Sequence, residues 1–388
     1  MRAQQRELHA KHERIKNAKI NIQSCNYFVC FMKYSDFQQQ GRLLRHEEAR
    51  RLITWFDEFE EVVKFATSKA TVFISHQWLG FQEPDPAGVH FKAICDACEE
   101  LCRHKNVSPQ EMYLWVDYSS IPQKNSKLKL LSISSIGMYA STACYFLIIC
   151  PVAVHCDSNA AVGPETYQRR GWCRLEQWAR MTVGGLQSMY IYDGALRPLS
   201  DSMAWYHESI SVMDGDFTDP NDKDKLVDTI LGLWSLAISH RGEADNTVIF
   251  DLVQQRREQV FPTKYFGDLV EMMEDDLSSR NGQNMGQVAS AGKATHMGSL
   301  FHLLKATSAE IKTDGGPLLR ISRFSVSHNV KGREDLEEQR EDLEEQREEG
   351  RDEQILRSRG KKTEMRNRDE EEQARPNDDR PPYPVVTI

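Results

Sequence analysis

Three short segments of the sequence carry acidic, imidazole and indole side chains that could do chemistry: 73–80 (FISHQWLG), 115–123 (WVDYSSIPQ) and 167–178 (YQRRGWCRLEQW). In the last of them, Trp172 and Glu176 are four residues apart, so on a helix they share one face. An indole beside a carboxylate removes water and raises the pKa of the carboxyl group. The alternative is a solvated Glu176 that pairs with Arg180 at i+4.

The other two segments place a histidine and an aspartate at the ends of apolar runs. His76 could act as a general base, or it could only hydrogen-bond neighbouring backbone. Asp117 could bind ribose hydroxyls, as acidic groups do in dinucleotide-binding folds. It could equally cap the turn that contains Ser119 and Ser120.

Two arginines, Arg169 and Arg170, precede the helix predicted to hold Glu176. Positive side chains are unfavourable at a helix N-terminus, and a bound anion such as the pyrophosphate of a dinucleotide would relieve this. The alternative is that both are solvated surface charges.

Three cysteines, Cys95, Cys98 and Cys102, include a pair with the spacing of half a zinc site. All three fall on the apolar face of a predicted helix, together with Ile94 and Leu101. The sequence has no second Cys or His pair that could complete a zinc site. We therefore expect core cysteines and no metal site.

Hydrophobic patterning predicts the elements that must hold these residues. Short apolar runs predict buried strands at 70–75, 113–117, 144–150 and 188–192. Periodicity of three to four residues predicts helices at about 41–66, 88–104, 171–182 and over much of 200–280. Strands that alternate with helices predict an α/β fold with a parallel sheet and helices on both faces. Ligands in such folds gather at the carboxyl ends of the strands, where His76, Asp117 and the segment after Cys150 should lie.

This pattern divides the chain into a helical segment at 1–68, an α/β domain at 69–195, a helical region at 196–280, and a flexible linker with a charged tail at 281–388. The tail contains two identical heptads, REDLEEQ, at 333–346. Each has a single leucine, which favours disorder or a solvated helix over a coiled coil. The acidic turn at 214–224 (DGDFTDPNDKD) is predicted to cap the following helix.

The order strand–helix–strand–loop–helix–strand resembles the Toll/interleukin-1 receptor (TIR) domain over about residues 70–195. In that family the first strand ends in a serine followed by an aromatic or similar residue, the second ends in an aspartate before a proline-containing loop, and a tyrosine lies five residues before a Trp-Cys-x-x-Glu motif. The residues of this sequence that match are Ser75, His76, Asp117, Tyr167, Trp172, Cys173 and Glu176.

The resemblance implies a flavodoxin-like fold and one of two functions. Some TIR domains cleave the nicotinamide–ribose bond of NAD, and the glutamate of the Trp-Cys-x-x-Glu motif is then catalytic, which here is Glu176. The cleavage passes through an oxocarbenium-like state that a carboxylate stabilises. The residues that we expect to bind NAD are Ser75, His76, Trp78, Asp117, Arg169, Arg170 and Trp172.

Other TIR domains are signalling scaffolds that self-associate, and here they would pair through the loop at 118–123. A third interpretation is an unrelated nucleotide- or sugar-binding α/β protein that shares only the fold. The first two interpretations both predict a homo-oligomer.

Composition and charge further restrict the classes of protein to which the chain could belong. The 388 residues carry a net charge of −9 and nine cysteines, and the longest apolar run, 144–154, is too short to span a membrane. The N-terminal residues lack the apolar run of a signal peptide. We therefore expect a cytoplasmic chain with reduced thiols, no membrane span and no specific nucleic-acid partner. Motifs of P-loop NTPases, classical dehydrogenases, α/β-hydrolases and zincins are absent from the sequence.

Overall fold

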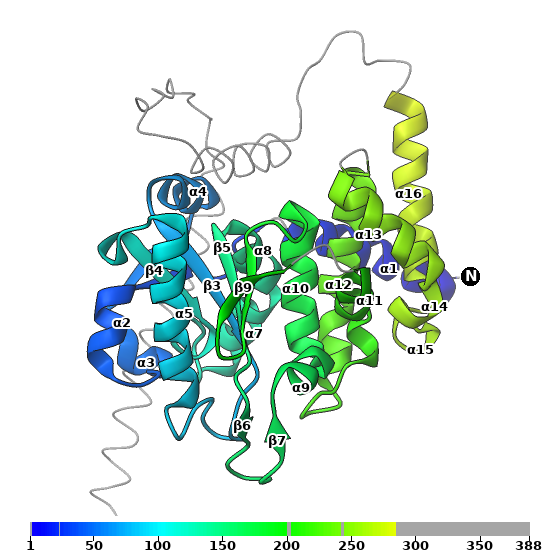
Figure 1. Ribbon diagram of the computed structural model, residues 1–388. Coiled ribbons are helices and arrows are strands. Elements are labelled where there is room, and N and C mark those ends of the chain that lie inside the picture. Colours follow the sequence, from blue (N-terminus) through cyan, green and yellow to red (C-terminus); the bar gives the residue numbers. More distant parts are fainter. Residues whose placement is uncertain (1, 23, 200–202, 242–243, 285–388) are drawn as a thin grey trace, which may run out of the picture. The chain divides into compact units, whose positions relative to one another are not determined.

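The computed structural model describes residues 2–22, 24–199, 203–241 and 244–284, and its centre is a seven-stranded sheet (Figure 1). The four inner strands are parallel, and the outer three pair antiparallel. In spatial order the strands are β2 (Ile53–Phe56), β1 (Val29–Lys33), β4 (Met112–Val116), β3 (Ala70–His76), β5 (Tyr145–Ile149), β8 (Met189–Tyr192) and β9 (Leu196–Pro198).

Alternation along the inner strands gives the sheet two apolar faces. On one face, Phe73 of β3 lies in register with Trp115 of β4 and Phe146 of β5. The three rings are stacked, with centroids 4.3 and 5.1 Å apart, and all are fully buried. The residues on either side of Phe73 in β3, Val72 and Ile74, point to the other face. Strands buried on both sides explain why these segments are mostly apolar in the sequence and do not alternate between apolar and polar residues.

Helices cover both faces of the sheet. One face carries α5 (Val89–Lys105), with α2 (Tyr34–Gln40) and α3 (His46–Ala49) beside it. The opposite face carries α8 (Ile136–Thr142) and α10 (Gly171–Gly184). The helix α4 (Phe59–Ser68) contributes Val62 to one core and Val63 to the other.

A second layer of helices packs on the outer side of α10. Its members are α11 (Met203–Ile210), α12 (Asp222–Ser239), α13 (Ala244–Gln255), α14 (Arg257–Val260), α15 (Thr263–Phe266) and α16 (Leu269–Asn284).

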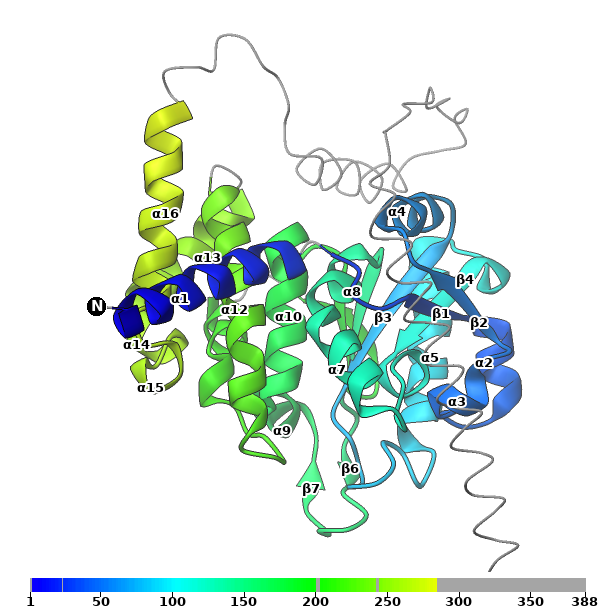
Figure 2. The ribbon, with the colours of Figure 1, turned by 180° about the vertical axis from the view of Figure 1, so that it is seen from behind.

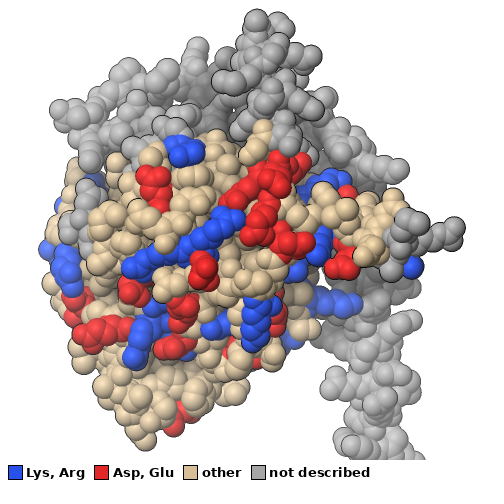
Figure 3. Space-filling model, turned by 90° about the vertical axis from the view of Figure 1, so that its right-hand side faces the viewer, with Lys and Arg blue, Asp and Glu red and all other residues tan. Residues whose placement is uncertain are grey.

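The first helix of the chain, α1 (Arg2–Asn21), belongs to the same layer and lies across α12 (Figure 2). Ile15 and Ala18 of this helix are buried in the contact. Lys11 and Lys19 form ion pairs with Asp268 and Asp276. Figure 3 views the molecule from this side and shows basic and acidic side chains intermixed.

Most of the predicted elements are confirmed. The four predicted strands correspond to β3, β4, β5 and β8, and the helices predicted at 88–104 and 171–182 correspond to α5 and α10. The prediction of one helix over 41–66 is wrong, because 53–56 is the edge strand β2 and α4 begins only at Phe59. Ile53 to Phe56 are β-branched or aromatic residues, and pairing with β1 outweighs their helical spacing. The segment 1–68, predicted as helical, thus adds two strands to the sheet.

The heptads at 333–346 and nearly all of the predicted linker and tail at 281–388 lie outside the described residues. Across the described ranges, no helix is both long enough and apolar enough to cross a membrane.

Candidate active site

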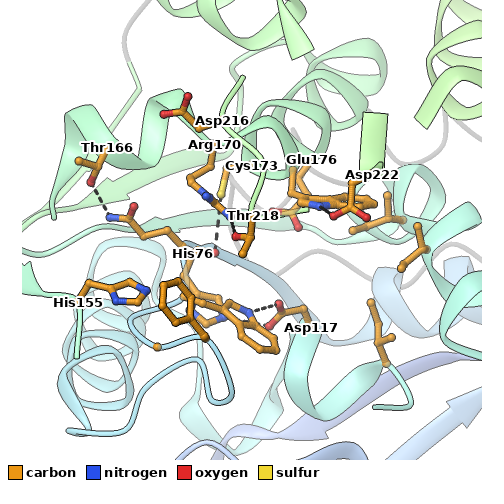
Figure 4. A pocket seen from close by; sticks show the side chains of 18 of the residues that line it. His76, Asp117, His155, Thr166, Arg170, Cys173, Glu176, Asp216, Thr218 and Asp222 are labelled. Atoms are coloured by element: carbon orange, nitrogen blue, oxygen red, sulfur yellow. Dashed lines mark hydrogen bonds and ion pairs between the residues drawn. The ribbon is translucent and has the colours of Figure 1, made fainter. Parts of the chain in front are cut away.

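A cavity of about 830 Å³ opens at the carboxyl ends of β3 and β4. The chain passes from β3 to β4 on one side of β3 and then to β5 on the other, so strand order reverses there. Open α/β sheets bind ligands at such a switch point, and the volume lies near the upper end of the range of small-molecule sites. Figure 4 shows side chains from the sheet, α10 and the start of α12 converging on this cavity.

Glu176 lies on α10 and lines the cavity, although only 7% of the residue is exposed. Its Oε2 accepts a hydrogen bond of 2.5 Å from the hydroxyl of Ser75, near the end of β3. The Ser75 hydroxyl also lies 2.7 Å from the hydroxyl of the buried Tyr167, so Tyr167 donates to Ser75 and Ser75 donates to Glu176.

The pKa of Glu176 is raised to about 8. The main cause is burial, because the charged form loses its hydration. The hydrogen bond from Ser75 acts in the opposite direction, and the negative charge of Asp117 adds to the rise. Arg180, the partner of the alternative interpretation, instead donates to the carbonyls of Ser141 and Ala143 at the end of α8. The interpretation of Glu176 as a solvated surface residue is therefore wrong.

Asp117 begins the short helix α6 (Asp117–Ser120) directly after β4 and is half-buried at the cavity wall. Its Oδ1 lies 3.0 Å from Nε2 of His76, and its Oδ2 accepts a bond of 2.7 Å from the indole of Trp78. Burial alone would raise the pKa of Asp117. The imidazole, the indole and the backbone N–H of Tyr118 more than offset this and hold that pKa below its usual value.

His76 has a partner at each ring nitrogen. Its Nδ1 lies 3.0 Å from Nδ1 of His90, in the first turn of α5, and its Nε2 faces Asp117. Burial, and to a lesser degree the neighbouring His76, lowers the pKa of His90 well below its usual value. With both nitrogens engaged, His76 orients Asp117, and it has no free nitrogen for the general-base role considered from the sequence.

Arg169, Arg170 and Trp172 line the cavity at the junction of α9 (Pro164–Arg169) and α10, and each contacts the segment 216–222. Arg169 lies 3.7 Å from Asp216, Arg170 donates to the Thr218 hydroxyl at 2.8 Å, and the Trp172 indole donates to Asp222 at 3.0 Å.

A glycine allows this close approach of the two segments. A Cβ on Gly171, the first residue of α10, would lie 1.9 Å from the ring of Phe217. The Gly171 N–H also donates to the carbonyl of Asp216. The acidic turn at 214–224 therefore forms a wall of the cavity, in addition to preceding α12. The Asp and Thr residues of this turn can be read from the sequence, but only the contact with Gly171 shows that they lie at the cavity.

The structure brings together the residues named from the sequence. Seven of them line the cavity: His76, Trp78, Asp117, Arg169, Arg170, Trp172 and Glu176. Ser75 lies behind Glu176, fully buried. The sequence does not point to Phe81, His90 or His155, because these residues reach the site from loops and a helix start without a recognisable motif. Thr218 and Asp222 belong to the turn at 214–224, which was predicted only to cap a helix.

The cysteines of α5 lie on its packed face. Cys98 and Cys102 are buried and Cys95 is half-buried. Within the described ranges, no cluster of three His, Cys, Asp or Glu side chains could hold a metal ion.

No protein-family model matches the sequence, and no curated protein or solved structure is significantly similar to the chain. The chemistry of the cavity is therefore the basis for inferring function.

Proposed function

We propose that this chain hydrolyses the bond between nicotinamide and ribose in NAD, with Glu176 as the catalytic residue. The observation that carries the proposal is a buried carboxyl group with a pKa raised to about 8, in the wall of a cavity at the switch point of the sheet. A carboxyl group with such a pKa, in a cleft, is typical of a functional site.

The strand order supports the resemblance to TIR domains. The parallel strands β4-β3-β5-β8 follow the order 2-1-3-4 of flavodoxin-like sheets, and Glu176 is carried by the helix between the third and fourth of them. The antiparallel strands β1, β2 and β9 extend this arrangement at both edges.

The charge of the substrate suits this carboxyl group. The nicotinamide ring of NAD is cationic, and a cation beside a buried carboxyl favours its ionised form. The C1′–N bond breaks with its electron pair going to the ring, so nicotinamide leaves neutral and the ribose becomes an oxocarbenium ion. The Glu176 carboxylate stabilises this cation. Water then attacks C1′ and gives up a proton, first to Glu176 and then to solvent, and the products are nicotinamide, ADP-ribose and H⁺.

Two further groups have suitable positions for binding. Asp117 Oδ2 accepts one bond, from Trp78, and retains a lone pair for a ribose hydroxyl. Arg169 and Arg170 supply positive charge to the cavity wall for the pyrophosphate.

The test is nicotinamide release by purified protein, measured by chromatography. Glu176→Gln keeps the acceptor for Ser75 and removes the charge, and we expect it to lower the rate about 100-fold or more. Glu165→Gln is the matched control, since Glu165 lies exposed on α9 outside the cavity, and it should leave the rate unchanged. Wild type that releases no nicotinamide at any protein concentration would refute the proposal.

A scaffold that pairs through residues 118–123 is less well supported. Tyr118, Ser119, Ser120, Ile121 and Pro122 are all buried, so this segment would have to open before it could contact a second copy. Concentration-dependent assembly that is lost on Pro122→Ala would revive this alternative.

A further inference from the structure

We infer that Phe81 and His155 form a stacking subsite for the second base of a dinucleotide, at the far end of the cavity from Glu176. The inference rests on the proposed function for the identity of the ligand. It adds a determinant of specificity: a dinucleotide is preferred over a nicotinamide mononucleotide.

The first observation is an aromatic pair in the cavity wall, in which Phe81 is exposed and His155 is half-buried. Phe81 follows β3, and its side chain lines the cavity although 57% of the residue is exposed. Its ring centroid lies 4.8 Å from that of His155, which comes from the turn between β6 (Ala153–Val154) and β7 (Ala161–Val162). The exposed part of the Phe81 ring offers a surface on which a planar base can stack.

The second observation is that hydrogen bonds join the two loops that carry this pair. The Phe81 N–H donates to Asp157 Oδ2 at 2.6 Å, and the Cys156 N–H donates to the Leu79 carbonyl at 2.7 Å. These bonds join the loop after β3 to the β6–β7 turn. Loops that are joined before the ligand arrives lose less entropy on binding than mobile loops do.

The residue between these contacts is a glycine for a steric reason. A Cβ on Gly80 would lie 2.9 Å from the carbonyl oxygen of Glu83 and 3.3 Å from Asp157. The close approach of the two loops therefore requires glycine at this position.

The third observation is the group that lies between the two ends. In the view of Figure 4, Arg170 lies between His155 and Glu176. A dinucleotide with its nicotinamide beside Glu176 and its other base on Phe81 would pass its pyrophosphate by this guanidinium. The cavity volume of about 830 Å³ accommodates such a ligand, whereas a mononucleotide at Glu176 would leave Phe81 in water.

Binding to the Glu176→Gln protein separates this subsite from the chemistry, because that variant keeps the cavity and slows cleavage. Calorimetry with NAD, nicotinamide mononucleotide and ADP as probes gives the affinities. We expect Phe81→Ala to weaken NAD and ADP binding about 5- to 150-fold, the range for loss of one base–aromatic stack. The affinity for nicotinamide mononucleotide should change less than about twofold, and Phe81→Tyr should restore NAD binding.

Val154→Ala is the matched control. Val154 lies on β6 of the same hairpin and is also 57% exposed, but it does not line the cavity. Unchanged NAD and ADP affinity in Phe81→Ala would overturn the subsite, even if wild type cleaves NAD. Conversely, ADP binding that depends on Phe81 in a protein that releases no nicotinamide would support the subsite and refute the proposed hydrolysis. A protein that binds neither NAD nor ADP would overturn both.

Discussion

The protonation state of Glu176 is set by opposing neighbours. Burial and Asp117 favour the neutral acid, and the hydrogen bond from Ser75 favours the carboxylate. A chain of bonds fixes the position of the group, since Tyr167 donates to Ser75 and Ser75 donates to Glu176. Asp117 is ionised for the opposite reason, because the neighbouring His76 imidazole, with smaller contributions from the Trp78 indole and the Tyr118 N–H, more than offsets its burial. Two carboxyl groups with pKa values driven apart can take different roles in one reaction.

The pH dependence of turnover follows from these pKa values. If the ionised form of Glu176 is the active one, kcat/KM for NAD should rise about tenfold per pH unit below a pKa of about 8 in the free enzyme and level off above it. Initial rates between pH 5 and 10 measure this profile. A profile that is flat from pH 6 to 9 would remove Glu176 from the role of ionising catalyst.

The same carboxyl group should make the free energy of unfolding fall as the pH rises, whereas turnover rises. Its pKa is higher in the folded protein, about 8, than in the unfolded chain, near 4.5. The unfolded state therefore ionises first, and the contribution of Glu176 is fully present below about pH 4.5 and is lost as the pH rises through about 8. Each pKa unit corresponds to roughly 1.4 kcal/mol, so the whole change is about 5 kcal/mol at most.

Urea unfolding of wild type and Glu176→Gln at pH 5 and pH 9 isolates this effect. The variant should gain stability relative to wild type by several kcal/mol on going to pH 9. The same difference in stability at both pH values would show that the Glu176 carboxyl group is not buried in the folded protein.

At the scale of elements, a glycine of α12 allows α1 to pack closely against that helix. A Cβ on Gly232 of α12 would lie 2.7 Å from Cβ of Ile22 and 2.8 Å from the carbonyl oxygen of Ala18. Gly232→Ala should therefore displace α1 and lower the free energy of unfolding by about 1–3 kcal/mol, as overpacking does.

Gly184→Ala provides the control for this substitution. Gly184 ends α10, and the nearest side-chain atom to its Cβ would be Arg180 Nη2 at 3.8 Å. Alanine fits there and should change stability by less than about 1 kcal/mol. Denaturant titrations of both variants decide the matter, and an unaltered midpoint for Gly232→Ala would mean that α1 is not tightly packed.

At the scale of the whole molecule, the sheet and the outer helices share one apolar core. The cluster that contains Phe73 and Phe146 of the sheet continues through Trp178 of α10 to Trp234 of α12. The described residues also fall within one compact unit. A core that extends through both layers makes them fold together, because neither can bury its apolar side alone.

We therefore expect the sheet and the helical layer to unfold in one transition. Trp115 reports on the sheet, and Trp234, stacked on Phe250, reports on the helices. The variant Trp115→Phe lacks the sheet signal, and Trp234→Phe lacks the helix signal. In each variant, the urea midpoint from fluorescence should equal the midpoint from far-UV circular dichroism. Two separated transitions would show that the layers are independent.

The sequence by itself determined the strands β3, β4, β5 and β8 and the helices α5 and α10. Each is a buried element whose apolar period is set locally by its own residues. It also placed His76 and Asp117 together, because the carboxyl ends of neighbouring parallel strands share one edge of the sheet.

Only the tertiary structure decided the rest. The edge strand β2 exists because β1 pairs with it, since its β-branched and aromatic residues also fit the helical spacing that continues into α4. The acidic turn at 214–224 became a cavity wall through Gly171 and Phe217, which are 46 positions apart in the sequence. The pKa of Glu176 depends on how deeply α10 is covered by its neighbours. That depth is a property of packing between distant segments, and such packing leaves no local pattern in the residues beside Glu176.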